Sequence, residues 1–224
     1  MLPRVVLHST VSLDGRIDWF TPDIGQFYEL AATWKEDATL AGSLTICKPS
    51  EAIPPEDDSA FAPPEKTAGD TRPLLVVPDS RGRVRNWHVL RAAGYWRDFV
   101  ALCAHSTPEE YLAYLKQRHV NCIVTGDERA DLRAALEALN ARYGVKTVRV
   151  DSGGVLNGVL LRAGLVQEVS VLVHPGLVGG TSPRSFFRAP DLTTAEGVIP
   201  LRLIQVEKLK GDAVWLRYEL ARQS

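Results

Sequence analysis

The sequence predicts an α/β fold of three layers, in which helices flank a mainly parallel central sheet that ends in a C-terminal antiparallel hairpin. Two observations predict it. Short apolar runs alternate with helical patterns, and several of these runs are apolar at consecutive positions. Such runs are typical of parallel strands that are buried on both faces. After Pro200, two alternating stretches surround Lys210-Gly211-Asp212, which predicts the hairpin.

Seven apolar runs precede the hairpin and are predicted to be its companion strands. They are Val5–His8, Ala38–Cys47, Leu74–Pro78, Phe99–Ala104, Cys122–Thr125, Val145–Val150 and Val169–His174. The stretches between them carry the period of helices, with apolar residues three and four positions apart. The helical stripes are Phe27, Leu30, Ala31 and Trp34; Leu132, Leu136, Leu139 and Tyr143, ended by Gly144; and Leu156, Leu160, Leu161 and Leu165. Thr107-Pro108-Glu109-Glu110 predicts a capping box with proline at the first helical position.

At 224 residues, the chain is expected to form a single domain over residues 1–224. A proline-rich loop at about residues 49–73 interrupts the pattern. It holds six of the fourteen prolines and the acidic run Glu56-Asp57-Asp58. A loop of this length is usually functional or disordered, and so a lid, a dimer arm and a disordered segment all remain open.

Charge and composition exclude several classes of protein. The net charge of −1 gives no electrostatic reason to expect nucleic acid or an anionic membrane as a partner. The first fifteen residues resemble neither a signal peptide nor a membrane span. Three widely spaced cysteines favour a reducing, cytoplasmic setting, and five histidines without metal-ligand spacing make a metal site unlikely.

The stretch from Val145 to Gly180 is the strongest indication of a cofactor. A β-branched run stops at Asp151-Ser152-Gly153-Gly154, and a helical pattern follows. Two glycines at such a turn let the backbone approach a ligand, and the start of a helix favours phosphate. The turn therefore predicts a nucleotide site, although a plain strand-to-helix connection has the same pattern.

Four segments together resemble the reductase domain of the riboflavin pathway, the RibD C-terminal domain, whose fold is that of dihydrofolate reductase. They are Leu7–Ile17, Ala41–Ile46, Val76–Arg83, and Val145–Gly180 with its closing glycine pair. The resemblance spans nearly the whole chain. No cytidine-deaminase-like segment precedes it, and so we expect a stand-alone reductase.

The resemblance implies NADPH as the cofactor, bound at the carboxyl ends of the strands. The implied cofactor-binding residues are the main chain of Thr10 and Val11, the side chain of Thr45, the pyrophosphate turn Gly153, Gly154, Val155, Leu156 and Asn157, and the 2′-phosphate position at Ser80 and Arg81. A hydroxyl and a guanidinium after a strand give a physical reason to prefer NADP over NAD. A solvated basic turn is the alternative for Ser80 and Arg81.

The expected substrate-facing residues lie near the same strand ends. Asp151 matches the family's acidic position and is our candidate catalytic residue, although an aspartate here could instead cap the following helix. The turn from Ser12 to Gly15, with Asp14, is expected to position the substrate. Trp19, in a loop with Phe20, is expected to stack on a planar ring, while core packing is the alternative for the aromatic residues of this region.

The implied reaction is hydride transfer to a pyrimidine ribosylamine such as 5-amino-6-(5-phosphoribosylamino)uracil. Three departures from the family pattern concern the substrate: Leu44 and Pro49 replace a small residue and an aspartate, and no arginine occurs between Arg16 and Arg72. Alternatives are therefore a related reductase of another small imine or carbonyl compound, and a non-catalytic NADP-binding protein.

A homodimer is expected as well. The last strand, Ala213–Leu220, carries apolar residues on both of its faces, and an uncovered strand of this kind would favour aggregation. A helix of the same chain could cover it instead.

Overall fold

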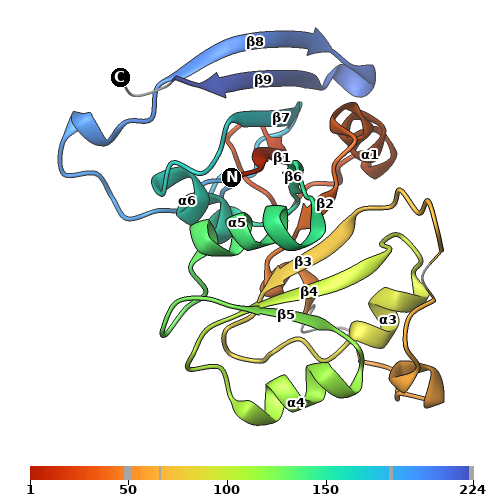
Figure 1. Ribbon diagram of the computed structural model, residues 1–224. Coiled ribbons are helices and arrows are strands. Elements are labelled where there is room, and N and C mark those ends of the chain that lie inside the picture. Colours follow the sequence, from red (N-terminus) through yellow and green to blue (C-terminus); the bar gives the residue numbers. More distant parts are fainter. Residues whose placement is uncertain (48–51, 66, 182–183, 222–224) are drawn as a thin grey trace. The chain divides into compact units, whose positions relative to one another are not determined.

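A computed structural model describes residues 1–47, 52–65, 67–181 and 184–221. The chain divides into two compact units (Figure 1). Unit 1 consists of Met1–Pro3 and Glu36–Val148, and unit 2 consists of Arg4–Lys35 and Arg149–Ser224. Strand β6 (Thr147–Val150) contains the boundary between them.

Unit 1 contains four parallel strands in the order β5-β4-β3-β2. They are β2 (Ala38–Leu40), β3 (Leu74–Pro78), β4 (Asp98–Cys103) and β5 (Asn121–Val124). The apolar runs predicted for β3, β4 and β5 are confirmed. The single run predicted over Ala38–Cys47 is wrong, because β2 ends at Leu40 and a short helix, α2 (Ser43–Ile46), follows. Gly42 causes this break: it caps α2 in an extended conformation, and its carbonyl accepts from the N–H groups of Thr45 and Ile46.

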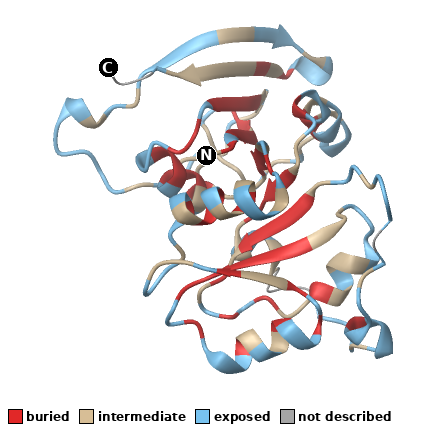
Figure 2. Cartoon of the chain, in the orientation of Figure 1, coloured by how far each residue is buried: buried red, intermediate tan, exposed pale blue. Residues whose placement is uncertain are grey.

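Helices cover both faces of the sheet in unit 1, which gives the expected three layers. Figure 1 shows α3 (Trp87–Ala92) and α4 (Glu109–Gln117) on one face, and α5 (Leu132–Tyr143) on the other. Trp87 and Tyr111 are almost fully buried against strand residues such as Leu75 and Phe99. Figure 2 shows the same pattern, with β3 and β4 mostly buried.

The ends of the helices test the predicted capping signals. Gly144 ends α5 with a positive φ of 68°, as expected. The capping box at Thr107 is wrong: α4 begins at Glu109, and no side chain caps it. The Thr107 hydroxyl instead accepts from the N–H of Ala104 and donates to the carbonyl of Ser80. A buried threonine that ties two loops together has the same sequence signature as an N-cap.

The proline-rich segment is partly anchored within unit 1; residues 49–51 and 66 lie outside the described residues. A short 3₁₀ turn, η2 (Asp58–Phe61), lies next to Arg118, which is 8% exposed. The Arg118 Nε donates to Glu56 at 2.6 Å, and its guanidinium stacks between the rings of Tyr114 and Phe61. These contacts hold residues 56–61 against the end of α4.

Unit 2 contains the order β1-β7-β9-β8. Strands β1 (Arg4–Ser12) and β7 (Glu168–His174) are parallel, while β9 (Val214–Leu220) is antiparallel to both β7 and β8 (Leu201–Lys208). The predicted hairpin is therefore confirmed, with a turn at η4 (Lys210–Asp212). The mainly parallel arrangement with a closing antiparallel pair matches the expected fold class.

Two helices pack on β1 and β7 from opposite sides. The helix α1 (Ile24–Ala31) continues into η1 (Ala32–Trp34), and both pack on Val6, Leu172 and Trp215. On the other side lies α6 (Gly154–Arg162), whose Asn157 contacts Ser9. Since successive strand residues point to opposite faces, His8 faces α1 and Ser9 faces α6.

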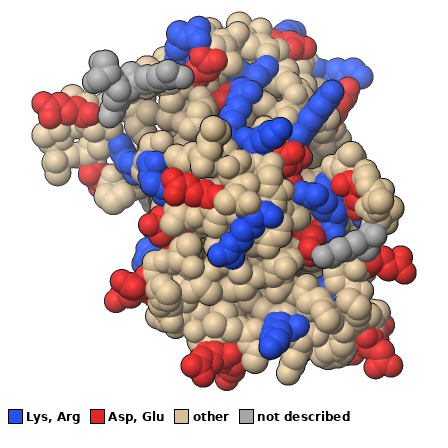
Figure 3. Space-filling model, viewed as in Figure 1, with Lys and Arg blue, Asp and Glu red and all other residues tan. Residues whose placement is uncertain are grey.

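The surface of the hairpin is more apolar than its position at a sheet edge would suggest. Strand β8 is exposed along most of its length (Figure 2), including Leu201, Leu203 and Val206. Charged side chains of both signs are interspersed over the face that Figure 3 shows. Among the described residues, no helix is long and apolar enough to span a membrane.

Candidate active site

The carboxyl ends of β1 and β7 lie side by side in unit 2, with Ser12 paired to His174. Ligands of open α/β sheets bind at such strand ends. Thr10 and Val11 are among the last residues of β1 before this edge, and the Thr10 Oγ1 is buried without a hydrogen-bond partner among the described residues. An unpaired buried hydroxyl is costly, and so a ligand that pairs with it would be stabilised there.

The turn after β1 is fixed by its own hydrogen bonds. Ser12 is fully buried; its hydroxyl donates to Asp14 at 2.6 Å and accepts from the N–H of Arg16 at 3.0 Å. Ser12 has no accessible surface and shapes the turn from within. This is compatible with the expectation that the turn positions the substrate, which stays a prediction.

Asp14 connects this turn to the loop after β7. Its carboxylate accepts from the N–H groups of Val178 and Gly179, at 3.1 and 2.6 Å, as well as from Ser12. These hydrogen bonds lower the pKa of Asp14 to about 2, with the Ser12 bond contributing most. Asp14 is thus occupied by protein donors, and one of them, the N–H of Gly179, belongs to a glycine pair in which both residues have φ above 70°.

Trp19 lies on the exposed loop between β1 and α1. It is 85% exposed and has a positive φ of 65°, which is uncommon for a bulky residue. Core packing is therefore excluded for Trp19, whereas Phe27 and Trp34 are core residues. Its stacking on a substrate ring stays a prediction.

Asp151 has two partners that place its carboxylate. Oδ2 accepts from the Tyr28 hydroxyl and from Nη1 of Arg149, both at 3.3 Å. The helix-capping alternative is wrong, since Gly153 is the N-cap of α6 and no side chain caps it. Arg149 is 5% exposed and was not identified from the sequence. The available signal was a charged residue inside a buried β-branched strand, which requires a partner.

The glycine turn leads directly into α6. Gly153 has open space around it: an added Cβ would meet only the Ile17 side chain, at 3.6 Å. The first N–H groups of a helix have no acceptor within the helix, and here Asn157 N–H is the donor that reaches back to Gly153. The N–H groups of Gly154, Val155 and Leu156 thus have no acceptor within α6; Val155 is 52% exposed, while Gly154 is buried.

Two residues of the turn have structural roles that the sequence did not reveal. Asn157 is 1% exposed, and its Nδ2 donates to the carbonyl of Phe186 at 2.8 Å. Its side chain therefore ties α6 to the segment around Phe186, and the expectation that the turn with Asn157 binds pyrophosphate stays a prediction. Gly154 is a glycine because a Cβ there would lie 2.0 Å from the carbonyl oxygen of Ser185.

The other three predicted cofactor residues belong to unit 1. Thr45 is exposed on α2, and Ser80 and Arg81 follow β3. The Ser80 hydroxyl accepts from the N–H of Ala130 at 2.9 Å. Arg81 is exposed and has no ion-pair partner among the residues that the structure describes. Two contacts join α2 to this turn, from Cys47 to the Arg83 carbonyl and from Asn86 to the Ile46 carbonyl.

The turn after β3 is held by contacts with buried residues. The buried Asp79 accepts from the N–H of Val84 at 2.8 Å. Gly82 has a φ of 65°, and a Cβ there would lie 2.7 Å from the Tyr111 ring. Arg85 is not available as a ligand contact, because its guanidinium stacks on Tyr111 and Tyr114.

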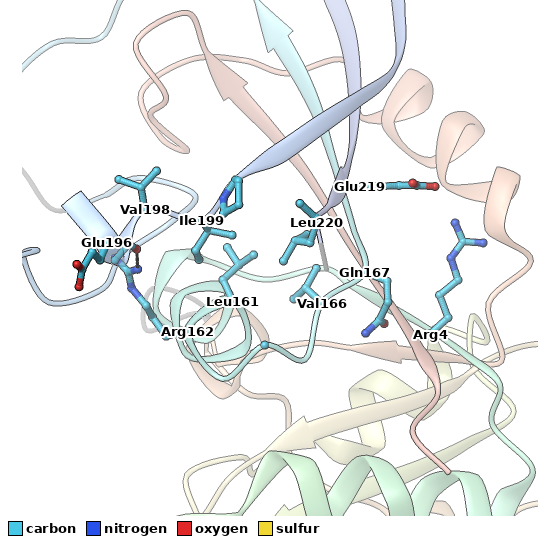
Figure 4. Close-up of a pocket in the computed structure, with 14 residues that line it drawn as sticks. Arg4, Leu161, Arg162, Val166, Gln167, Glu196, Val198, Ile199, Glu219 and Leu220 are labelled. Atoms are coloured by element: carbon cyan, nitrogen blue, oxygen red, sulfur yellow. Dashed lines mark hydrogen bonds between the residues drawn. The ribbon is translucent and has the colours of Figure 1, made fainter. Parts of the chain in front are cut away.

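A large cavity of unit 2 lies elsewhere. Its volume is about 970 Å³, and α6, the 196–200 segment and the end of β9 line it (Figure 4). Arg4 begins β1, and Val166 and Gln167 precede β7, so the cavity opens at the amino ends of the parallel strands. We therefore place the candidate active site at the opposite, carboxyl ends.

Comparison with known proteins gives consistent results. A family model described as the RibD C-terminal domain matches residues 3–215. Two relatives, each 29% identical, are the 2,5-diamino-6-ribosylamino-4(3H)-pyrimidinone 5′-phosphate reductases of Methanothermobacter thermautotrophicus and Archaeoglobus fulgidus. The first match covers 96% of this chain and 97% of the relative, and the second covers 97% and 99%.

Solved structures show the same fold at lower identity. RibD of Acinetobacter baumannii is 19% identical with a TM-score of 0.69, and the match covers 98% of this chain and 58% of that protein. A pyrimidine reductase-like protein of Corynebacterium diphtheriae is 15% identical with a TM-score of 0.71, over 99% and 93% of the two chains. The expected dihydrofolate-reductase-like fold is thereby confirmed.

Proposed function

Because the chain belongs to the RibD C-terminal domain family, we propose that it is an NADPH-dependent reductase of a phosphorylated ribosylaminopyrimidine. The observation that carries the proposal is the arrangement in unit 2. A carboxylate held by Tyr28 and Arg149 precedes an open glycine turn, at the start of a helix that favours phosphate.

The residues present fit a dinucleotide. The open N–H groups at the start of α6 would receive the pyrophosphate, and the unpaired Thr10 hydroxyl offers a buried polar contact beside the nicotinamide position. In unit 1, taken by itself, the family pattern assigns the 2′-phosphate to Ser80 and Arg81, and Arg81 is exposed without an ion-pair partner among the described residues. NADPH, when bound, supplies the hydride; the protein supplies orientation and electrostatics.

The protein's own part in the reaction is to orient the substrate. Asp151 is the residue that we assign to substrate contact. Its carboxylate is an acceptor only, and it can receive hydrogen bonds from the amino groups of a diaminopyrimidine ring. Arg149 and Tyr28 fix the position of the Asp151 carboxylate. The Ser12–Asp14 turn would form a neighbouring side of the substrate site, and the exposed Trp19 would cover the pyrimidine ring.

The relatives favour a particular member of the substrate class. They are named for the 2,5-diamino compound, which carries one amino group more than the uracil that the sequence suggested. An acceptor at Asp151 is suited to an additional ring amino group. The absence of arginines between Arg16 and Arg72 keeps a second candidate, a reductase of an unphosphorylated imine or carbonyl compound.

A direct assay tests the proposal. NADPH oxidation is followed at steady state with the diaminopyrimidinone ribosylamine phosphate, the corresponding uracil, and an unphosphorylated analogue. We expect turnover with the diamino phosphate and a lower kcat/KM with the other two. Comparable rates with and without the phosphate would favour the second candidate, and no oxidation with any compound would favour a non-catalytic NADP-binding protein.

Arg81 is expected to select NADPH over NADH. Arg81→Ala should raise the Kd for NADPH about tenfold or more, because charge-assisted hydrogen bonds to phosphate contribute about 1.5–3 kcal/mol. The Kd for NADH should stay within a factor of two. Fluorescence titration with both cofactors measures the two effects, and Arg83→Ala, two residues away, is the matched control. Equal losses for both cofactors would contradict the assignment.

We also propose a homodimer in a reducing, cytoplasmic setting. The exposed apolar residues of β8 (Leu201, Leu203 and Val206) leave the hairpin without a cover among the described residues. Light scattering at micromolar concentration should give twice the chain mass of 24.6 kDa. Val206→Glu should shift the particle toward the monomer, whereas a wild-type mass of one chain would contradict the dimer.

A further inference from the structure

A chain of buried hydrogen bonds crosses three strands of unit 2 and ends on helix α1. The Trp215 Nε1 on β9 contacts the Ser170 Oγ on β7 at 2.7 Å. The same Oγ contacts Nδ1 of His8 on β1 at 3.0 Å, and the His8 Nε2 contacts the carbonyl oxygen of Phe27 at 2.9 Å. None of these three side chains is more than 4% exposed.

With His8 neutral, the donors and acceptors of these hydrogen bonds can be ordered in only one way. An indole N–H only donates, and a carbonyl oxygen only accepts. The Ser170 hydroxyl therefore accepts from Trp215 and donates to the His8 Nδ1, and the His8 Nε2–H donates to Phe27. Burial lowers the pKa of His8 to about 4, and the charges of Arg149 and Arg217 act in the same direction. His8 is thus neutral at pH 7, in one tautomer.

This series of hydrogen bonds ends next to the candidate active site. The His8 ring also stacks on Phe27, with ring centroids 4.3 Å apart. The next residue, Tyr28, donates to Asp151, although its side chain is 53% exposed. The Tyr28 ring packs edge-to-face on Phe27, with ring centroids 5.1 Å apart, so the position of its hydroxyl follows the position of α1 on the sheet.

We propose that the Trp215–Ser170–His8 chain sets the orientation of α1, so that the Tyr28 hydroxyl meets Asp151. His8 and Ser170 are then positioning residues for the substrate-binding carboxylate. The consequence for substrate rests on the proposed function, in which Asp151 contacts the pyrimidine. The effect on the position of α1 does not rest on the proposed function.

The position of α1 is tested without any substrate. Ser170→Ala removes the hydroxyl, and Val171→Ala is the matched control, since Val171 is the next residue of β7 and points to the opposite face. Hydrogen–deuterium exchange over residues 24–31 should become about tenfold faster in Ser170→Ala than in Val171→Ala at equal thermal stability. Equal exchange in both variants would overturn the proposal.

The link to Asp151 is tested by kinetics. His8→Leu should raise the substrate KM about tenfold while the NADPH Kd is unchanged. The resulting shift of α1 would break the hydrogen bond from the Tyr28 hydroxyl to the charged Asp151, and hydrogen bonds to charged groups are the stronger ones. His8→Gln, whose amide can still donate to Phe27, should recover most of this loss. In the background of Tyr28→Phe, His8→Leu should cost no further KM, since both changes remove the same contact.

Two outcomes separate this inference from the proposed function. If the wild type does not turn over the pyrimidine, the proposed function fails, and the exchange experiment still decides the role of His8 and Ser170. If the wild type is active but His8→Leu and Tyr28→Phe have additive effects on KM, the positioning role is overturned and the proposed function stands.

Discussion

Glu168→Leu is expected to lower the free energy of unfolding by about 3–5 kcal/mol, because removing one partner of a buried ion pair leaves the other charge uncompensated. The Glu168 side chain is fully buried at the start of β7 and pairs with two arginines, Arg4 and Arg217. The Trp34 Nε1 donates to the same carboxylate at 3.2 Å. All of these partners would lose their acceptor at once. Urea denaturation measures the loss.

Glu219 provides the matched control. It is the register partner of Glu168 on β9, but its side chain is 45% exposed and pairs only with the exposed Arg202 among the described residues. Glu219→Leu should change stability by less than about 1 kcal/mol, as is usual for surface ion pairs. Similar losses for the two variants would show that the buried network contributes nothing specific.

Gly158→Ala is expected to destabilise the protein by about 2–3 kcal/mol through overpacking. Gly158 lies on α6, and a Cβ there would sit 1.8 Å from the carbonyl oxygen of Arg188. Backbone must therefore move, since the obstructing atom is not the end of a flexible side chain. The shift would also disturb the start of α6, because the N–H of Arg188 bonds to the Gly154 carbonyl.

Gly176→Ala is the control for this second variant. Gly176 has an ordinary φ and nothing within 4 Å of an added Cβ. Its alanine variant should unfold within about 0.5 kcal/mol of the wild type, as is usual for surface changes. A Gly158→Ala protein as stable as Gly176→Ala would mean that the 184–189 segment does not pack on α6 as the structure shows.

The sequence predicted most of the sheet, because buried parallel strands leave uninterrupted apolar runs. It failed at Ala38–Cys47, where an apolar run continues past the end of a strand and only Gly42 marks the break. It failed also at Thr107, because a side chain that bonds to distant loops looks like an N-cap in a local pattern. Both errors arise from contacts that a single segment does not contain.

The candidate site was predicted less completely than the fold. Asp151 was chosen through the family pattern, and the turn at Gly153 was chosen through its glycine pair between a strand and a helix; both roles remain predictions. Arg149, the buried partner of Asp151, was not, although an arginine in a buried strand is an unusual residue. Ser12 and Asn157 belong to the turns assigned to ligands, and the structure buries both side chains within those turns.

The central claim is that the Gly153 turn receives the cofactor, and Gly153→Val tests it most directly. The position has φ −79° and ψ 171°, which a β-branched residue adopts without strain, and an added Cβ meets only Ile17. The variant should therefore unfold like the wild type. Its Kd for NADPH, measured by fluorescence titration, should rise about a hundredfold, or close to 3 kcal/mol, because the side chain occupies the place of the pyrophosphate. A folded Gly153→Val protein that binds NADPH as tightly as the wild type would contradict the account.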